Sequence, residues 1–121
     1  MMQSLEEISN IQLMHTFRFY LPNGSEEQKV CITQFQHLVN KLCGGSTMYI
    51  GKGSWISPDS LTITEDVSIL EVYCDITPEE MNLMIRAFIE YGEKTDQQSL
   101  GVFQDGKYYL INLEEGGEEG K

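Results

Sequence analysis

Five side chains in this sequence have the chemistry to hold a small polar molecule: Tyr20, Lys52, Trp55, Glu65 and Gln97. Together they offer aromatic rings, a cation, a carboxylate and an amide, which are groups that orient ligands in binding sites. If the chain is an enzyme, Glu65 is the candidate general acid or base, and Lys52 or Gln97 would polarise the substrate. That role requires burial to raise the pKa of Glu65 toward neutrality.

Each of these residues also has a structural interpretation. Trp55 could cover the end of a hairpin, because a lone tryptophan usually packs against its neighbours. Gln97 could cap a helix. Glu65 and Lys52 could be solvated surface residues. The sequence alone leaves both interpretations open at each position.

The common catalytic motifs are missing. The sequence has no HExxH, GxGxxG or P-loop motif and no Ser/His/Asp order. His15 lies in an aromatic stretch, where we expect an interior or interface histidine, and His37 is expected on a helix surface. We therefore favour a non-catalytic binding protein over an enzyme and predict no catalytic residue, metal or cofactor.

Composition limits the classes of partner. The 121 residues carry a formal net charge of -11, which repels nucleic acid at long range. No apolar run is long enough to cross a bilayer, and the first ten residues lack a basic region followed by an apolar stretch. The three cysteines show no CxxC or Cys/His ligand spacing, so we expect reduced thiols and a cytoplasmic location, without a nucleic-acid or membrane partner.

One domain accounts for most of the chain. Residues 1–10 are predicted to be a flexible arm, residues 11–113 a single domain, and residues 114–121 an acidic disordered tail, since four of the last eight residues are glutamates and none is apolar.

The pattern of apolar residues predicts strands and helices in a fixed order. Alternation over residues 13–21 indicates a strand, and two further strands follow at residues 47–55 and 61–74, the second apolar on both faces and therefore central. Residues 100–104 and 107–113 form a predicted hairpin with a type I′ turn at Asp105-Gly106.

Two helices separate the strands. The first has two candidate caps, Ser25 with Gln28 and Thr33 with Gln36. We place its start near Thr33, because the apolar run at residues 30–32 fits a docking segment, and its end at Gly44. The second begins after the Thr77 cap, with Pro78 in its first turn and Glu80 completing the capping box, and is expected to end at Gly92.

This order is that of a ferredoxin-like α+β fold, βαββαβ, with an extra C-terminal strand. Right-handed crossovers predict the strand order 4-1-3-2. Tyr20, Lys52, Trp55, Glu65 and Gln97 then meet at one edge of the sheet. The first helix begins at the same edge, where its free N–H groups could receive an anion.

Several short motifs resemble those of a family of small uncharacterised bacterial α+β proteins. They are Gly44-Gly45-Ser46-Thr47, Gly51-Lys52-Gly53-Ser54-Trp55, Glu65, Gly92-Glu93-Lys94-Thr95-Asp96-Gln97 and Asp105-Gly106-Lys107-Tyr108-Tyr109-Leu110-Ile111. The resemblance covers roughly residues 16 to 111 and implies an architecture and candidate positions, but no activity. Ser46 and Asp96 depart from the family pattern, which has Ala and Asn at these places.

These observations favour a protein that holds a small polar ligand, nucleotide-like molecules included, or a protein partner at the sheet edge, as a bacterial or phage accessory protein. The alternative is a small dimeric α+β-barrel-type enzyme that uses Glu65. Both faces of the predicted sheet are apolar, whereas helices cover only one, so we also predict a homodimer or a higher even oligomer.

Overall fold

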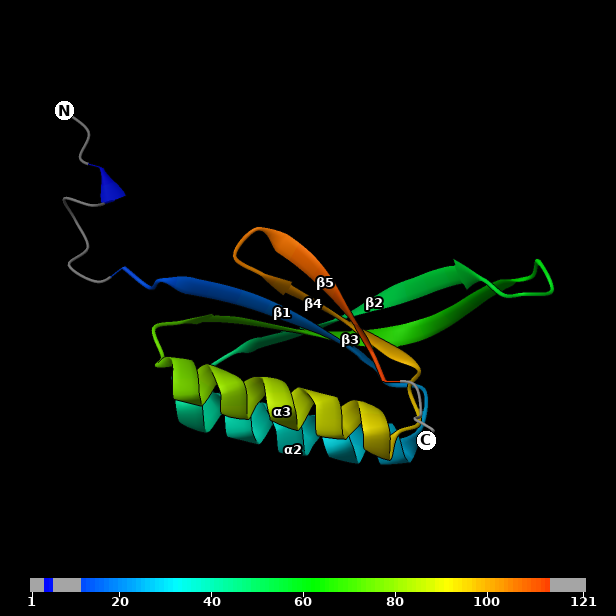
Figure 1. Ribbon diagram of the computed structural model, residues 1–121, viewed down its shortest axis with the longest axis horizontal. Helices are drawn as coiled ribbons and strands as arrows, with labels where there is room; N and C mark the ends of the chain where they lie inside the picture. Colours follow the sequence, from blue (N-terminus) through cyan, green and yellow to red (C-terminus); the bar gives the residue numbers. More distant parts are fainter. Residues whose placement is uncertain (1–3, 6–11, 114–121) are drawn as a thin grey trace.

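The computed structural model describes residues 4–5 and 12–113. Two helices lie side by side across one face of a five-stranded antiparallel sheet (Figure 1). In chain order the elements are β1 (His15–Pro22), α2 (Glu26–Cys43), β2 (Thr47–Ile56), β3 (Thr62–Cys74), α3 (Pro78–Lys94), β4 (Ser99–Gln104) and β5 (Lys107–Asn112). The fold is the predicted ferredoxin-like α+β arrangement with an extra C-terminal strand.

The strand order β2-β3-β1-β4-β5 confirms the predicted topology, with β5 added beyond β4. It also confirms that β3 is an inner strand, paired with β2 on one side and β1 on the other. The β2–β3 hairpin runs past the ends of the helices as a projecting arm (Figure 1). One side of the sheet is therefore covered by helices, and the other, here called the open face, is not.

The core lies between the helices and the sheet. Alternate residues of β1 point toward the helices, so Phe17, Phe19 and Leu21 are fully buried. The ring of Phe19 contacts Phe35 of α2 and Phe88 of α3 edge-on, with centroids 5.0 and 4.9 Å away. These contacts fix both helices to the central strand.

The predicted start of α2 is wrong. The helix begins at Glu26, because the Ser25 hydroxyl accepts a hydrogen bond from the Gln28 N–H while the Gln28 side chain accepts one from the Ser25 N–H. Residues 30–32 are helical rather than a docking segment: Val30 is exposed and Ile32 joins the buried stripe. The predicted end is confirmed, since Gly44 has a φ of 92°.

The capping box of α3 is confirmed, with Thr77 and Glu80 bonded reciprocally and Pro78 in the first turn. Its predicted end is wrong, because the helix continues through Gly92 to Lys94. A Cβ at Gly92 would lie 2.5 Å from Leu113 and 2.6 Å from Leu100. This glycine allows β4 and the end of the domain to pack closely against α3, instead of ending the helix.

The β4–β5 turn is of the predicted type I′, with a φ of 49° at Asp105 and 91° at Gly106. The Asp105 carboxylate accepts a hydrogen bond from the Thr16 N–H at 2.8 Å and lies 2.8 Å from His15 Nδ1. These contacts tie the turn to the start of β1. His15 is thus a partly exposed partner of the turn, with 28% of its side chain accessible.

Candidate ligand-binding site

A hollow of about 780 Å³ lies on the open face of the sheet, between the β2–β3 arm and the β4–β5 hairpin. Its floor is formed by residues that strand register places on the side away from the helices. Tyr20 is paired with Gly101, and Glu65 is paired with Gly53. The segment that joins α3 to β4, residues 96–98, forms one wall. We call this feature the sheet hollow.

Four of the five predicted site residues line the sheet hollow: Tyr20, Trp55, Glu65 and Gln97. They come from β1, β2, β3 and the segment after α3, so the predicted convergence of distant segments is correct for these four.

Lys52 does not line the sheet hollow, which corrects its predicted place. Side chains alternate along a strand, and Lys52 therefore lies on the opposite face from its neighbours Gly51 and Gly53. There its Nζ lies 2.6 Å from Asp66 Oδ1 of the paired strand. Lys52 thus forms an exposed ion pair instead of facing a ligand.

The N-terminus of α2 is also absent from the residues that line the sheet hollow. The Ser25 and Gln28 N–H groups are occupied by the capping box, and Glu26 and Glu27 add negative charge to the first turn. The expectation that this helix end would receive an anion has no support in the geometry.

Two glycines of the sheet hollow allow side chains from neighbouring strands to lie across them. A Cβ at Gly101 would lie 1.7 Å from the Tyr108 hydroxyl oxygen, so the Tyr108 side chain lies directly across this glycine. The Tyr108 ring meets the Tyr20 ring edge-on, 5.7 Å between centroids. A Cβ at Gly53, which is paired with Glu65, would lie 3.1 Å from Cγ2 of Val67, so the Val67 side chain packs closely over this glycine.

Glu65 is the partly buried carboxylate of the sheet hollow. Burial raises its pKa above the usual 4.5. Its carboxylate forms no hydrogen bond or ion pair with another residue that the structure describes. Trp55 stands nearby with 47% of its surface accessible, so it does not pack as a closed cap over the hairpin.

Sequence reasoning missed several lining residues, Tyr108 and Asp96 among them. A signal for Tyr108 was available. The type I′ turn pairs Lys107 with Gln104, which pairs Leu110 with Gly101 and places Tyr108 on the same face as Tyr20. No comparable signal existed for Asp96, whose place depends on a left-handed backbone, φ 57°, after α3.

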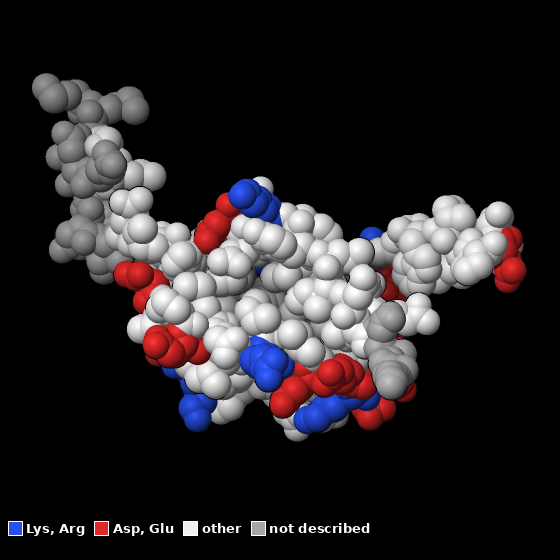
Figure 2. All heavy atoms as spheres, viewed as in Figure 1, with Lys and Arg blue, Asp and Glu red and all other residues white. Residues whose placement is uncertain are grey.

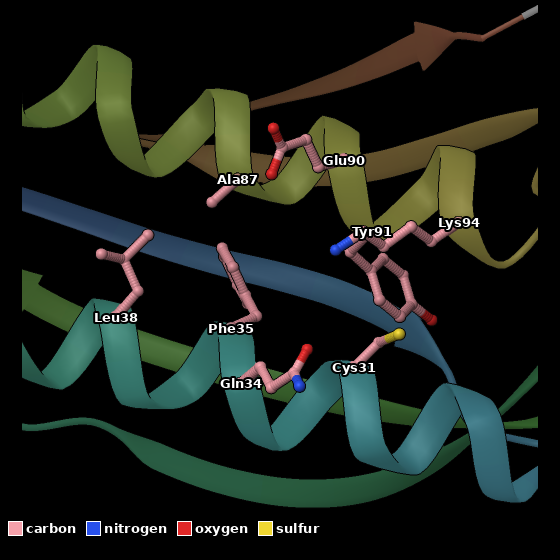
Figure 3. A pocket seen from close by; sticks show the side chains of 8 residues that line it. All are labelled: Cys31, Gln34, Phe35, Leu38, Ala87, Glu90, Tyr91 and Lys94. Atoms are coloured by element: carbon pink, nitrogen blue, oxygen red, sulfur yellow. The ribbon is translucent and has the colours of Figure 1, made fainter.

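A second, smaller hollow of about 200 Å³, here called the helix groove, lies between the two helices, and Figure 3 shows its lining. Cys31 and Tyr91 lie close together there, and the Tyr91 hydroxyl donates a hydrogen bond to the Pro22 carbonyl. This volume is below the 300–1,000 Å³ range typical of small-molecule sites. The sheet hollow is therefore the better candidate.

Within residues 4–5 and 12–113, no three His, Cys, Asp or Glu side chains are grouped as a metal site would need. Neither helix in the described part is both long and apolar enough to span a membrane.

Comparisons with known proteins show similarity in structure only. No family model and no curated protein sequence matches the chain. A phage SAM lyase in the apo state superposes with a TM-score of 0.65 and 13% identity, over 96% of this chain and 98% of that one. A phage SAM lyase in complex with S-methyl-5′-thioadenosine gives 0.62 and 12%, over 87% and 96%.

The periplasmic divalent cation tolerance protein CutA from Archaeoglobus fulgidus also matches, with a TM-score of 0.47 and 13% identity over 87% of this chain and 89% of that one. At such identities, the two SAM lyase structures share the fold with this chain, and no activity follows from that similarity alone.

Proposed function

We propose that this chain binds a small polar molecule with an aromatic ring system, such as a nucleoside, in the sheet hollow. The observation that carries the proposal is the convergence of Tyr20, Trp55, Glu65 and Gln97 from four segments on one open hollow of about 780 Å³. A space of this size accommodates a nucleoside, for which the helix groove is too small.

Aromatic side chains provide the ring-binding surface. Tyr20, Trp55 and Tyr108 all line the sheet hollow, and Trp55 and Tyr108 expose 47% and 60% of their surface. Stacking of a base on an aromatic side chain contributes about 1–3 kcal/mol. Exposed rings beside a hollow therefore suit a flat ligand better than a purely aliphatic one.

Polar groups beside the rings would orient the ligand. The Glu65 carboxylate has no partner among the described residues and can accept hydrogen bonds from ribose hydroxyls. The Gln97 amide donates to its own neighbour, the Thr95 carbonyl, at 3.3 Å, which leaves its oxygen as a further acceptor.

The choice of a first probe follows from the structural neighbours. One phage SAM lyase structure holds S-methyl-5′-thioadenosine. An adenosine derivative is therefore a sensible first ligand for a chain of the same fold, and a bacterial or phage accessory role is the matching biological setting.

An enzyme is the second candidate. The observation that favours it is the pKa of Glu65, which burial raises, because a carboxyl group with a raised pKa is better suited to proton transfer near neutral pH. In that case Glu65 would act as the acid or base in the same hollow. Incubation with S-adenosylmethionine and chromatography of the products distinguishes an enzyme from a binding protein.

Calorimetric titration with S-methyl-5′-thioadenosine tests the proposal. We expect saturable binding by the wild type and at least a tenfold loss in Glu65→Gln, with the fold intact by circular dichroism. Lys52→Gln is the control, because Lys52 lies outside the hollow, and it should bind as the wild type does. No binding by the wild type, or an equal loss in both variants, would contradict the proposal.

We also propose that two copies associate through their open faces. Tyr49 and Tyr73 lie on this face outside the residues that line the sheet hollow, and 41% and 52% of their surface is accessible. Figure 2 shows charged side chains mainly over the helices and at the hairpin tips, with uncharged surface between them. Light scattering should give a mass of at least twice 13.8 kDa at micromolar concentration, and a monomer would contradict this.

A further inference from the structure

The charged groups that line the sheet hollow are all acidic. Glu65 and Asp96 contribute carboxylates, and no lysine, arginine or histidine is among the described lining residues. Neither carboxylate side chain has a hydrogen-bond or ion-pair partner within the described part of the chain. The described lining of the sheet hollow therefore contributes two carboxylates and no cation, which favours a positively charged group.

Two cations on the strands that form the sheet hollow are already engaged. Arg18 lies on the open face further along β1, where its Nε is 2.8 Å from Glu71 Oε2 and its guanidinium lies 4.5 Å from the Phe103 ring centre. Lys52 is on the other face with Asp66. A phosphate group in the sheet hollow would thus meet two carboxylates and no cation among the described lining residues.

Aromatic rings beside these carboxylates add to the preference for positive charge. Trp55, Tyr20 and Tyr108 each present a ring to the sheet hollow. The negative face of such a ring attracts a cation, by about 0.5–1 kcal/mol when exposed and about 2 kcal/mol when desolvated. Carboxylates and aromatic rings together are the groups that recognise sulfonium and ammonium centres.

We propose that the sheet hollow selects its ligand by positive charge, binding an aromatic molecule that carries a sulfonium, or an ammonium in the sulfonium's place, and rejecting phosphorylated molecules. This inference rests on the proposed function and names the class of ligand. It replaces the expectation that the start of α2 receives an anion.

A matched pair of ligands tests the selection. S-adenosylmethionine carries a methylsulfonium where S-adenosylhomocysteine carries a neutral thioether, and the two molecules are otherwise the same. Sinefungin carries an ammonium in that place and serves as a cation without the sulfonium leaving group. We expect both cations to bind at least tenfold more tightly than S-adenosylhomocysteine at low salt, and ATP to bind more weakly than any of them.

Variants locate the source of the preference. Glu65→Gln combined with Asp96→Asn should reduce the cation preference to within about threefold, because the affinity for the two cations falls further than the affinity for S-adenosylhomocysteine. Asp66→Asn is the matched control, because Asp66 adjoins Glu65 in β3 but faces the other side of the sheet, and the preference should persist.

The outcomes separate this inference from the proposed function. Equal affinity for the charged and neutral ligands, or tighter binding of ATP, overturns charge selection and leaves nucleoside binding in place. Failure of every nucleoside, neutral or charged, to bind overturns both. A cation preference that survives the double variant also overturns the assignment to Glu65 and Asp96.

Discussion

Glu65 and Asp66 are neighbours in β3, but they lie on opposite faces of the sheet and in opposite surroundings. Asp66 accepts a hydrogen bond from Lys52, which lowers the pKa of Asp66. Glu65 faces the sheet hollow, where burial raises its pKa and no described residue pairs with it. In this part of β3, the carboxylate on the helix side is partnered by the protein, whereas the one on the open side is left available to a ligand.

The largest difference in stability between two variants is expected for Phe19 and Tyr20, which are neighbours in β1 but point to opposite faces of the sheet. Phe19→Ala removes a fully buried ring that contacts both helices, and should lower the free energy of unfolding by about 3–5 kcal/mol. Tyr20→Ala changes the open face instead, and should leave stability within about 1 kcal/mol while weakening ligand binding. Urea unfolding and calorimetric titration measure the two effects. Similar destabilisation by both variants would contradict the assignment of stability to the helix side of the sheet and of ligand binding to the open face.

Two glycines offer a second, smaller contrast. Gly92→Val forces side-chain atoms into contact with Leu100 and Leu113 and should destabilise the domain by about 1–3 kcal/mol. Gly101→Ala instead displaces Tyr108, whose hydroxyl end lies on the open face and can move. We expect little change in melting temperature but at least a threefold loss of ligand affinity, and unchanged affinity would show that the place of Tyr108 is unimportant.

The smallest predicted effect is the change in folding stability with pH. The pKa of Glu65 is raised in the folded state, so its ionised form opposes folding at neutral pH, and this penalty disappears as pH falls through the raised pKa. Asp66 has a lowered pKa, so its contribution favours folding at neutral pH and is lost as pH falls through the acidic range. At pH 7, Glu65→Gln should keep or slightly raise the melting temperature, and Asp66→Asn should slightly lower it.

Ligand affinity should change with pH as the Glu65 carboxyl group gains or loses its proton. A cationic ligand needs the carboxylate, so its affinity should fall as pH decreases through the raised pKa of Glu65, at a higher pH than for an ordinary glutamate. Asp66→Asn should show the same profile as the wild type. A flat profile in the wild type would show that Glu65 does not contact the ligand.

The topology could be predicted because local signals agreed with one another. The alternation in β1, the Thr77–Glu80 capping box and the Asp105-Gly106 turn each specify one element, and their order leaves few arrangements of the strands. The start of α2 was missed because two capping boxes competed in the sequence. The end of α3 was missed because the requirement for a glycine at position 92 comes from Leu100 and Leu113, which are distant along the chain.

The site was only partly accessible to sequence reasoning, for a similar reason. Strand pairing predicts that Tyr20, Trp55 and Glu65 meet at the open face. Lys52 was wrongly placed with them, because side chains alternate along β2 and Lys52 lies on the other side of the sheet with Asp66. The position of Asp96 depends on a single left-handed residue. The predicted arm at residues 1–10 lies largely, and the tail at residues 114–121 entirely, outside the described residues.

Mapping amide chemical shifts by NMR tests the central claim most directly. Titration of the ¹⁵N-labelled full chain with sinefungin should shift the amides of Tyr20, Glu65, Gln97 and Tyr108, which line the sheet hollow. The amides of Cys31 and Lys94 in the helix groove should stay in place and serve as the internal control. Shifts confined to the helix groove, or no shifts at millimolar ligand, would contradict the assignment of the sheet hollow as the binding site.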